Sequence, residues 1–187
     1  MSITKEIVDY LDNKSEVDKW IRLKGEKKYL QFADVLKEHG QPVTWQNISE
    51  LYRYDKRLLI NLFQYLSFFE EYLRALVWNA SETEYKKLSE RYLNDAVDLV
   101  IELKDSVDCE AGFMNNLIAN RDYINGLRNR VSHNKIMLNY IKNEKTFRDM
   151  ILLFKKSLPA EYQNGFAKDI NSCAKGLRIC DFLIVRI

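Results

Sequence analysis

The scarcity of residues that interrupt helices constrains this chain more than any other feature. Its 187 residues include only six glycines and two prolines. Long stretches without such residues favour helices over a β architecture, which needs frequent turns. Hydrophobic residues make up 47% of the chain and charged residues 30%, which is enough apolar surface for a packed core. We therefore expect an all-α helical bundle.

Apolar spacing and capping signals place the expected helices along the chain. A short helix opens the chain over residues 4–12, and Ser15 begins a second helix that ends near Lys37 with His39 in its last turn. Pro42 marks the expected boundary between an N-terminal helical extension (residues 1–42) and a helical bundle (residues 43–187). Further helices are expected over residues 44–52 (capped by Thr44), 55–79, 81–92, 94–104, 113–137 (with a candidate break at Asn125–Gly126) and 144–158 (capped by Asn143). A last helix is expected from Pro159, with an apolar seam of Tyr162, Phe166, Ile170, Cys173, Leu177 and Cys180.

Charge and cysteine content exclude several function classes. A net charge of +2 gives no bulk signal for nucleic-acid binding, so any contact with RNA must use a local basic patch. Cys109, Cys173 and Cys180 include no Cys-x-x-Cys pair, which disfavours a disulfide framework or a zinc site. The polar N-terminus does not resemble a signal peptide, and no apolar run is long enough to span a membrane. We expect a cytoplasmic protein with no metal, no cofactor and no membrane partner.

One segment, residues 127–134, concentrates groups that can act on a phosphodiester. It reads Leu-Arg-Asn-Arg-Val-Ser-His-Asn and holds one of the two histidines of the chain. Arg128 is a permanent cation that can hold a phosphate through two parallel hydrogen bonds. His133 can carry protons near neutral pH. The other histidine, His39, is explained as a helix-end residue that interacts with the helix dipole.

A carboxylate occupies an unexpected place on the predicted helix 55–79. At 100° per residue, Glu70 falls in the apolar stripe of that helix, and a buried charge needs a partner. Arg74 lies one turn later in the favourable order. Arg128 likewise lies on the apolar face of its own helix, so Glu70 is also expected to hold Arg128. Two alternatives stay open: the pair supports a catalytic cation, or it is a structural ion pair that fixes helix register.

The segment suits RNA cleavage without a metal, in which the 2′-hydroxyl attacks the adjacent phosphorus. That reaction needs a base, an acid and a cation beside the phosphorane. If the helix is unbroken, His133 lies about 140° around it from Arg128 and shares its outward face with Asn129. A symmetric homodimer would bring two His133 side chains into one cleft, with Arg128 stabilising charge and Asn129 orienting a group. Arg130 and Lys135 are candidates for holding flanking RNA phosphates.

These residues resemble a known family. The segment 127–134 is similar to the HEPN superfamily motif, in which histidine follows arginine after four to six residues, and Phe69-Glu70-Glu71-Tyr72-Leu73-Arg74 resembles the Glu-x-x-Leu-Arg stretch of its Abi-like, abortive-infection branch. The resemblance covers roughly residues 55–158. It implies an all-α bundle that dimerises across the motif helices. It also implies an endoribonuclease of antiviral defence or toxin type, with Arg128 and His133 catalytic, Asn129 at the polar position and Glu70 supporting.

The resemblance also leaves the activity open, because some members of that superfamily bind RNA or a protein partner without catalysis. Lys135 stands where branches controlled by nucleotidyltransferase antitoxins often carry a tyrosine, which disfavours that arrangement while leaving an antitoxin or another protein partner open. Three hypotheses follow: a metal-independent ribonuclease, a non-catalytic module that binds RNA or a protein, and a structural homodimer.

Overall fold

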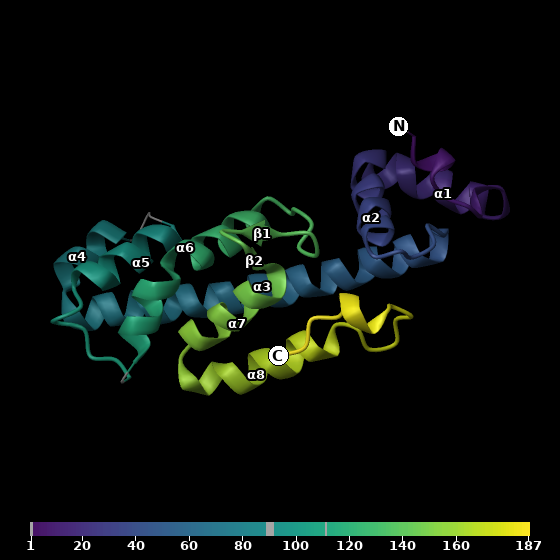
Figure 1. Cartoon of the computed structure of the whole chain (residues 1–187). Coiled ribbons are helices and arrows are strands. Elements are labelled where there is room, and N and C mark those ends of the chain that lie inside the picture. Colours follow the sequence, from purple (N-terminus) through teal and green to yellow (C-terminus); the bar gives the residue numbers. More distant parts are fainter. Residues whose placement is uncertain (1, 89–91, 111) are drawn as a thin grey trace.

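The structure is a computed structural model that describes residues 2–88, 92–110 and 112–187. Within these residues the chain forms eight α-helices, and its strands make only one short hairpin, which confirms the all-α expectation (Figure 1). No helix in this part of the chain is long and apolar enough to cross a membrane. In order, the elements are η1 (Ile3–Lys5), α1 (Tyr10–Lys24), α2 (Glu26–Glu38), α3 (Trp45–Ala80), α4 (Glu82–Leu88), α5 (Leu93–Glu102), α6 (Phe113–Ser132), β1 (Ile141–Lys142), β2 (Lys145–Thr146), α7 (Phe147–Ser157), α8 (Ala160–Ser172) and η2 (Asp181–Leu183).

Helix α3 is the long axis of the molecule. Its 36 residues span roughly 54 Å at 1.5 Å per residue. The predicted helices over residues 44–52 and 55–79 are one helix, because the stretch contains neither glycine nor proline. The Thr44 hydroxyl caps it by accepting the backbone N–H of Asn47 at 3.1 Å, as predicted. In Figure 1, α1 and α2 lie at one end of α3, and α4–α6 and α7–α8 flank the rest.

Two hydrophobic clusters lie along α3. The first turns of the helix, with Ile48 and Leu51, pack with Phe32 of α2 and with Ile136 and Leu183 from later in the chain. From Tyr54 onward, α3 packs with α5, α6, α7 and α8. The N-terminal helices and the bundle therefore share one helix. The domain boundary at residue 42 stays a prediction.

The N-terminal helices differ from the prediction in two places. The expected helix over residues 4–12 is wrong, because only the short 3-10 helix η1 forms there and α1 begins at Tyr10. Gly25 adopts φ 85°, which a side chain disfavours, and it separates α1 from α2 where one helix was expected. Ser15 lies inside α1, so its expected capping role is wrong. His39 follows α2, and its Nδ1 lies 2.8 Å from the carbonyl oxygen of Val35. The structural interpretation of this histidine is confirmed.

Helix α6 is continuous through Asn125–Gly126, so the candidate break is not used. A Cβ at Gly126 would lie 2.5 Å from the Tyr140 hydroxyl, so a larger residue there would displace the end of the Tyr140 side chain. The helix ends at Ser132 rather than near Met137. The β1–β2 hairpin that follows was not predicted.

The hairpin turn explains why the next helix begins later than expected. Asn143 and Glu144 both have positive φ, 49° and 64°, as a two-residue hairpin turn of the mirror-image type requires. Asn143 is thus a turn residue and not a cap. Thr146 caps α7, since its hydroxyl accepts the Asp149 N–H at 3.3 Å while the Asp149 carboxylate accepts the Thr146 N–H at 2.9 Å.

Helix α4 spans Glu82–Leu88, and residues 89–91 of the expected helix 81–92 lie outside the described residues. One further helix end falls short of the prediction. Helix α8 follows Pro159 as expected but ends at Ser172, shortly before Gly176 at φ 74°. The apolar seam therefore does not continue along a helix to Leu177 and Cys180.

Candidate functional site

The C-terminal end of α6 holds His133 at the surface. Asn134 adopts the left-handed conformation at φ 50°. Its N–H donates to the carbonyl of Val131, and the N–H of Lys135 donates to the carbonyl of Arg130, each at 3.0 Å. These two bonds form a Schellman motif, which ends the helix. His133 is the exposed C-cap residue, and no described group hydrogen-bonds to its ring, so the imidazole is open to a ligand.

Arg128 lines a groove between α3 and α6. The guanidinium is half-buried, 5.0 Å from the centroid of the exposed Tyr92 ring, and Nη1 donates to Asn129 Oδ1 at 3.3 Å. Because this one long bond uses a single donor, other donors stay available to an anion. The groove has a volume of about 150 Å³ and is lined by Phe63, Leu66, Ser67 and Glu70 of α3, Leu93 of α5, and Arg128, Val131 and Ser132 of α6.

Glu70 shares this groove but does not hold Arg128. Its Oε1 accepts from Arg74 Nη2 at 2.7 Å and from Nε at 3.1 Å, so the predicted pairing within the helix is confirmed. Arg74 also donates to the Leu88 carbonyl at 2.9 Å. The Glu70 side chain is 32% exposed and not buried, and no ion pair joins the described Glu70 and Arg128. The expected clamp on Arg128 is wrong, since Arg74 lies one turn away and satisfies the carboxylate.

Arg130 and Lys135 have different surroundings. The Arg130 guanidinium donates to the Ile136 carbonyl at 2.5 Å and to Asn139 Oδ1 at 2.8 Å, and it lies 4.3 Å from the centroid of the Tyr140 ring. Burial lowers its pKa. Arg130 therefore stabilises the segment that follows α6, residues 136–140. Lys135 is exposed. Contact of either residue with RNA stays a prediction.

A buried carboxylate anchors the segment after His133. Asp55 of α3 is fully buried, and its Oδ1 accepts the backbone N–H of Met137 at 2.7 Å. Its other oxygen has no hydrogen-bond partner among the described residues. Burial raises the pKa of Asp55 to about 6, although the bond from Met137 opposes this shift.

Two lysines meet at the same segment. Lys28 of α2 donates to the Asn134 carbonyl at 3.0 Å and lies 3.4 Å from Asn134 Oδ1, and Lys56 of α3 donates to the same Oδ1. Burial, followed by the nearby Lys56 charge, lowers the pKa of Lys28 to about 8, so it stays mostly charged at pH 7. The end of α6 thus combines His133 with two cations from other helices.

Asp55, Lys28 and Lys56 were not among the residues predicted for the site. Asp55 lies in the apolar stripe of α3, three and four residues before Leu58 and Leu59, so the helical-wheel test applied to Glu70 would have found it. Lys28 gave no signal, because it lies 106 residues before its partner Asn134 and only the tertiary fold joins them.

Among the described residues, no group of three or more His, Cys, Asp or Glu side chains is arranged to hold a metal ion. Comparison of the chain with protein-family models, with curated proteins and with solved structures finds no match.

Proposed function

We propose that this chain is a metal-independent endoribonuclease, related to the Abi-like HEPN proteins, that cuts RNA where two copies bring their α6 ends together. The observation that carries the proposal is the exposed imidazole of His133, to which no described residue hydrogen-bonds, at the end of the helix that also holds the half-buried Arg128 in a groove. A histidine held open in this way is suited to proton transfer near neutral pH.

The proposed reaction uses the 2′-hydroxyl of RNA as the nucleophile. One His133 removes its proton while a P–O2′ bond forms, and the P–O5′ bond breaks as the second His133 protonates the leaving oxygen. The products are a 2′,3′-cyclic phosphate and a 5′-hydroxyl. Arg128 stabilises the added negative charge on the phosphorane, and Asn129 positions its guanidinium.

The second histidine requires a second copy of the chain, and the surface beside the groove supports this. Ile60 and Phe63 of α3 are 66% and 64% exposed, and Phe63 lines the same groove as Arg128. Exposed apolar side chains next to a catalytic group suit a homodimer interface across α3 and α6.

Cleavage of mixed RNA in excess EDTA tests the proposal. We expect cleavage to persist in EDTA, to fall by about 100-fold or more in His133→Ala because a general acid and base is lost, and to fall by about 100-fold in Arg128→Ala. His39→Ala and Arg121→Ala are the matched controls, since His39 is the other histidine and Arg121 pairs with Asp98 at the surface of α6. Cleavage that EDTA abolishes, or that survives in His133→Ala, would overturn the proposal.

RNA binding without cleavage in the same assay would favour the non-catalytic alternative. Unfolding in Arg128→Ala with no effect of His133→Ala would favour a structural homodimer. Thermal melting of each variant separates loss of activity from loss of the fold.

A further inference from the structure

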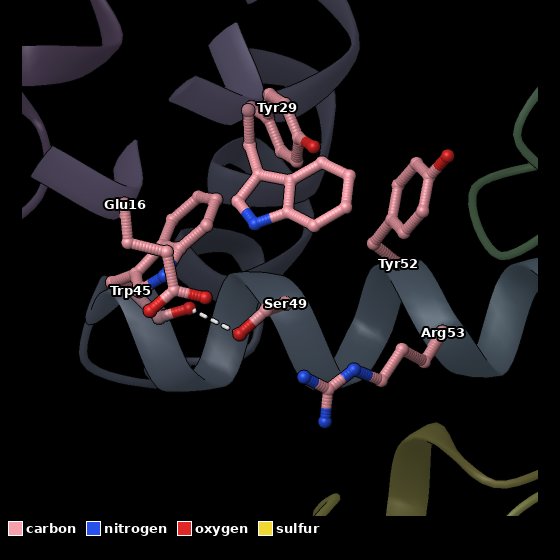
Figure 2. Close-up of a pocket in the computed structure, with 7 residues that line it drawn as sticks. Glu16, Tyr29, Trp45, Ser49, Tyr52 and Arg53 are labelled. Atoms are coloured by element: carbon pink, nitrogen blue, oxygen red, sulfur yellow. Dashed lines mark hydrogen bonds between the residues drawn. The ribbon is translucent and has the colours of Figure 1, made fainter. Parts of the chain in front are cut away.

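The N-terminal helices enclose an aromatic pocket against the start of α3. Its volume is about 150 Å³. It is lined by the rings of Trp20, Tyr29, Trp45 and Tyr52 and by the polar groups of Glu16, Ser49 and Arg53. Figure 2 shows Tyr29, Trp45 and Tyr52 around this space, with Ser49 and Arg53 toward one side of it. Flat rings around an open space, with polar groups at one edge, suit a planar ligand that carries hydrogen-bonding groups.

The two lysines beside Asn134 form an unusual pair. Lys28 and Lys56 both reach the same amide oxygen, although two ammonium groups repel each other. Among the described residues, neither lysine forms an ion pair with a carboxylate. The buried Asp55 bonds to Met137, and its charge acts on both lysines without an ion-pair contact. A phosphate placed between the two ammonium groups would relieve their repulsion.

The aromatic pocket and the lysine pair adjoin each other. Tyr52 lines the pocket, and the Lys56 ammonium lies 5.8 Å from the centroid of its ring. Tyr29, the residue after Lys28, stands 5.7 Å from Tyr52, centroid to centroid. An aromatic ring and an ammonium group therefore lie side by side here, as the base and the phosphate of one nucleotide require.

We propose that the aromatic pocket and the Lys28–Lys56 pair form one nucleotide subsite, in which a base of bound RNA stacks against Tyr52 and Trp20 while its phosphate lies between the two lysines. The proposal builds on the ribonuclease function above, because Asn134 joins the subsite directly to His133. It gives the N-terminal helices a role: they supply Trp20 and Lys28 and hold the RNA strand beside the cleavage site.

Charge favours a nucleotide over a cationic ligand in the same pocket. An aromatic pocket can hold a cation over its rings. Here the lysine pair next to the pocket repels a positive ligand, and Glu16 is the one acidic residue of its lining. A ligand that combines a flat ring with a negative group can stack in the aromatic pocket and also bind the lysine pair.

Tryptophan fluorescence provides a direct test with mononucleotides. Trp20 and Trp45 line the pocket, while Trp78 packs on Tyr85 at the far end of α3. We expect AMP or UMP to quench the fluorescence saturably, adenosine to bind at least about tenfold more weakly, and inorganic phosphate to compete. The double variant Lys28→Met/Lys56→Met is expected to weaken AMP binding at least about tenfold. Lys155→Met/Lys156→Met on α7 is the matched control and should bind as the wild type does.

The aromatic half has its own pair of variants. Tyr52→Phe keeps a ring and is expected to retain AMP binding, whereas Tyr52→Leu is expected to weaken it by about 5- to 100-fold. For single-stranded RNA in a His133→Ala background, the lysine double variant should reduce the slope of log affinity against log salt by about 0.7 for the lost phosphate. Equal affinity for AMP and adenosine, or unchanged AMP affinity in the lysine double variant, would overturn the subsite.

The subsite and the ribonuclease function can fail separately. EDTA-resistant, His133-dependent cleavage without AMP binding removes only the subsite. AMP binding that needs Lys28, Lys56 and Tyr52, without RNA cleavage, removes only the nuclease activity and leaves a nucleotide-binding site.

Discussion

The two aromatic clusters of this protein use their rings in opposite ways. In the bundle, the Phe154 ring packs edge-on between Phe69 and Phe166, with centroids 5.8 and 5.5 Å away and interplanar angles of 88° and 89°. All three side chains are fully buried. These rings fill space completely, and their role is stability.

In the N-terminal unit, the rings leave an opening. Tyr29 packs against Trp45 at 5.5 Å and against Tyr52 at 5.7 Å, yet Tyr52 and Trp20 stay half-exposed around the pocket. The difference teaches that apolar spacing alone does not separate a core from a binding surface. The exposed fraction of each ring distinguishes the two clusters here, since the bundle rings are fully buried and Trp20 and Tyr52 are not.

The largest expected effect is on the closed cluster. Phe154→Ala should destabilise the fold by about 3–5 kcal/mol, because it leaves a cavity between two fixed rings. Tyr52→Ala should cost less than half as much, since it widens a pocket that is already open. Urea denaturation of both variants measures the two free energies of unfolding. Equal losses would contradict the distinction between the clusters.

A second effect concerns Asp55, which lies where the two regions meet. Its folded pKa of about 6 lies above the ordinary value of 3.8, so the folded state binds the proton more tightly than the unfolded state. This contribution to stability is complete below about pH 4 and is lost as the pH rises through 6, by on the order of 3 kcal/mol at most. Asp55→Asn should lack this loss. Urea denaturation from pH 4 to 8 measures it, and Asp105→Asn, an exposed acid, should keep the wild-type dependence.

The smallest effect tests the helix end that presents His133. Asn134→Ala should cost about 1 kcal/mol, because alanine tolerates the left-handed conformation poorly. Asn134→Gly should cost less, since glycine adopts that conformation freely. Thermal melting compares the two variants. If alanine and glycine destabilise the protein equally, then the bonds of the Asn134 amide to Lys28 and Lys56, which both variants lose, and not its backbone conformation, hold this segment.

Periodicity and capping predicted the parts of the fold that depend on local sequence. The Thr44 cap was predicted from its residue type, and most residues of α3, α6 and α7 were predicted from apolar spacing. The break at Gly25 was not predicted, because a glycine ends a helix only where the fold makes the chain turn. The hairpin was not predicted, because strands of two residues are too short to show an alternation of apolar and polar residues.

The candidate site was predictable only in part, for a similar reason. The segment of Arg128, Asn129 and His133 is continuous in sequence and was visible as a motif. Two arginines could have paired with Glu70: Arg74, one turn away on the same helix, and Arg128, on another helix. The structure shows the pair with Arg74, which is nearer in sequence. Lys28 reaches the site from 106 residues away, so only the folded chain reveals it.

The central claim is that His133 moves protons during attack by the 2′-hydroxyl of RNA. An RNA oligonucleotide and the same oligonucleotide with one 2′-O-methyl group at the cleavage position, both incubated in EDTA, test it most directly. We expect the wild type and His39→Ala to cut only the unmodified RNA and to leave a 2′,3′-cyclic phosphate, and His133→Ala to cut neither. Cleavage of the methylated position, or unchanged cleavage by His133→Ala, would contradict the account.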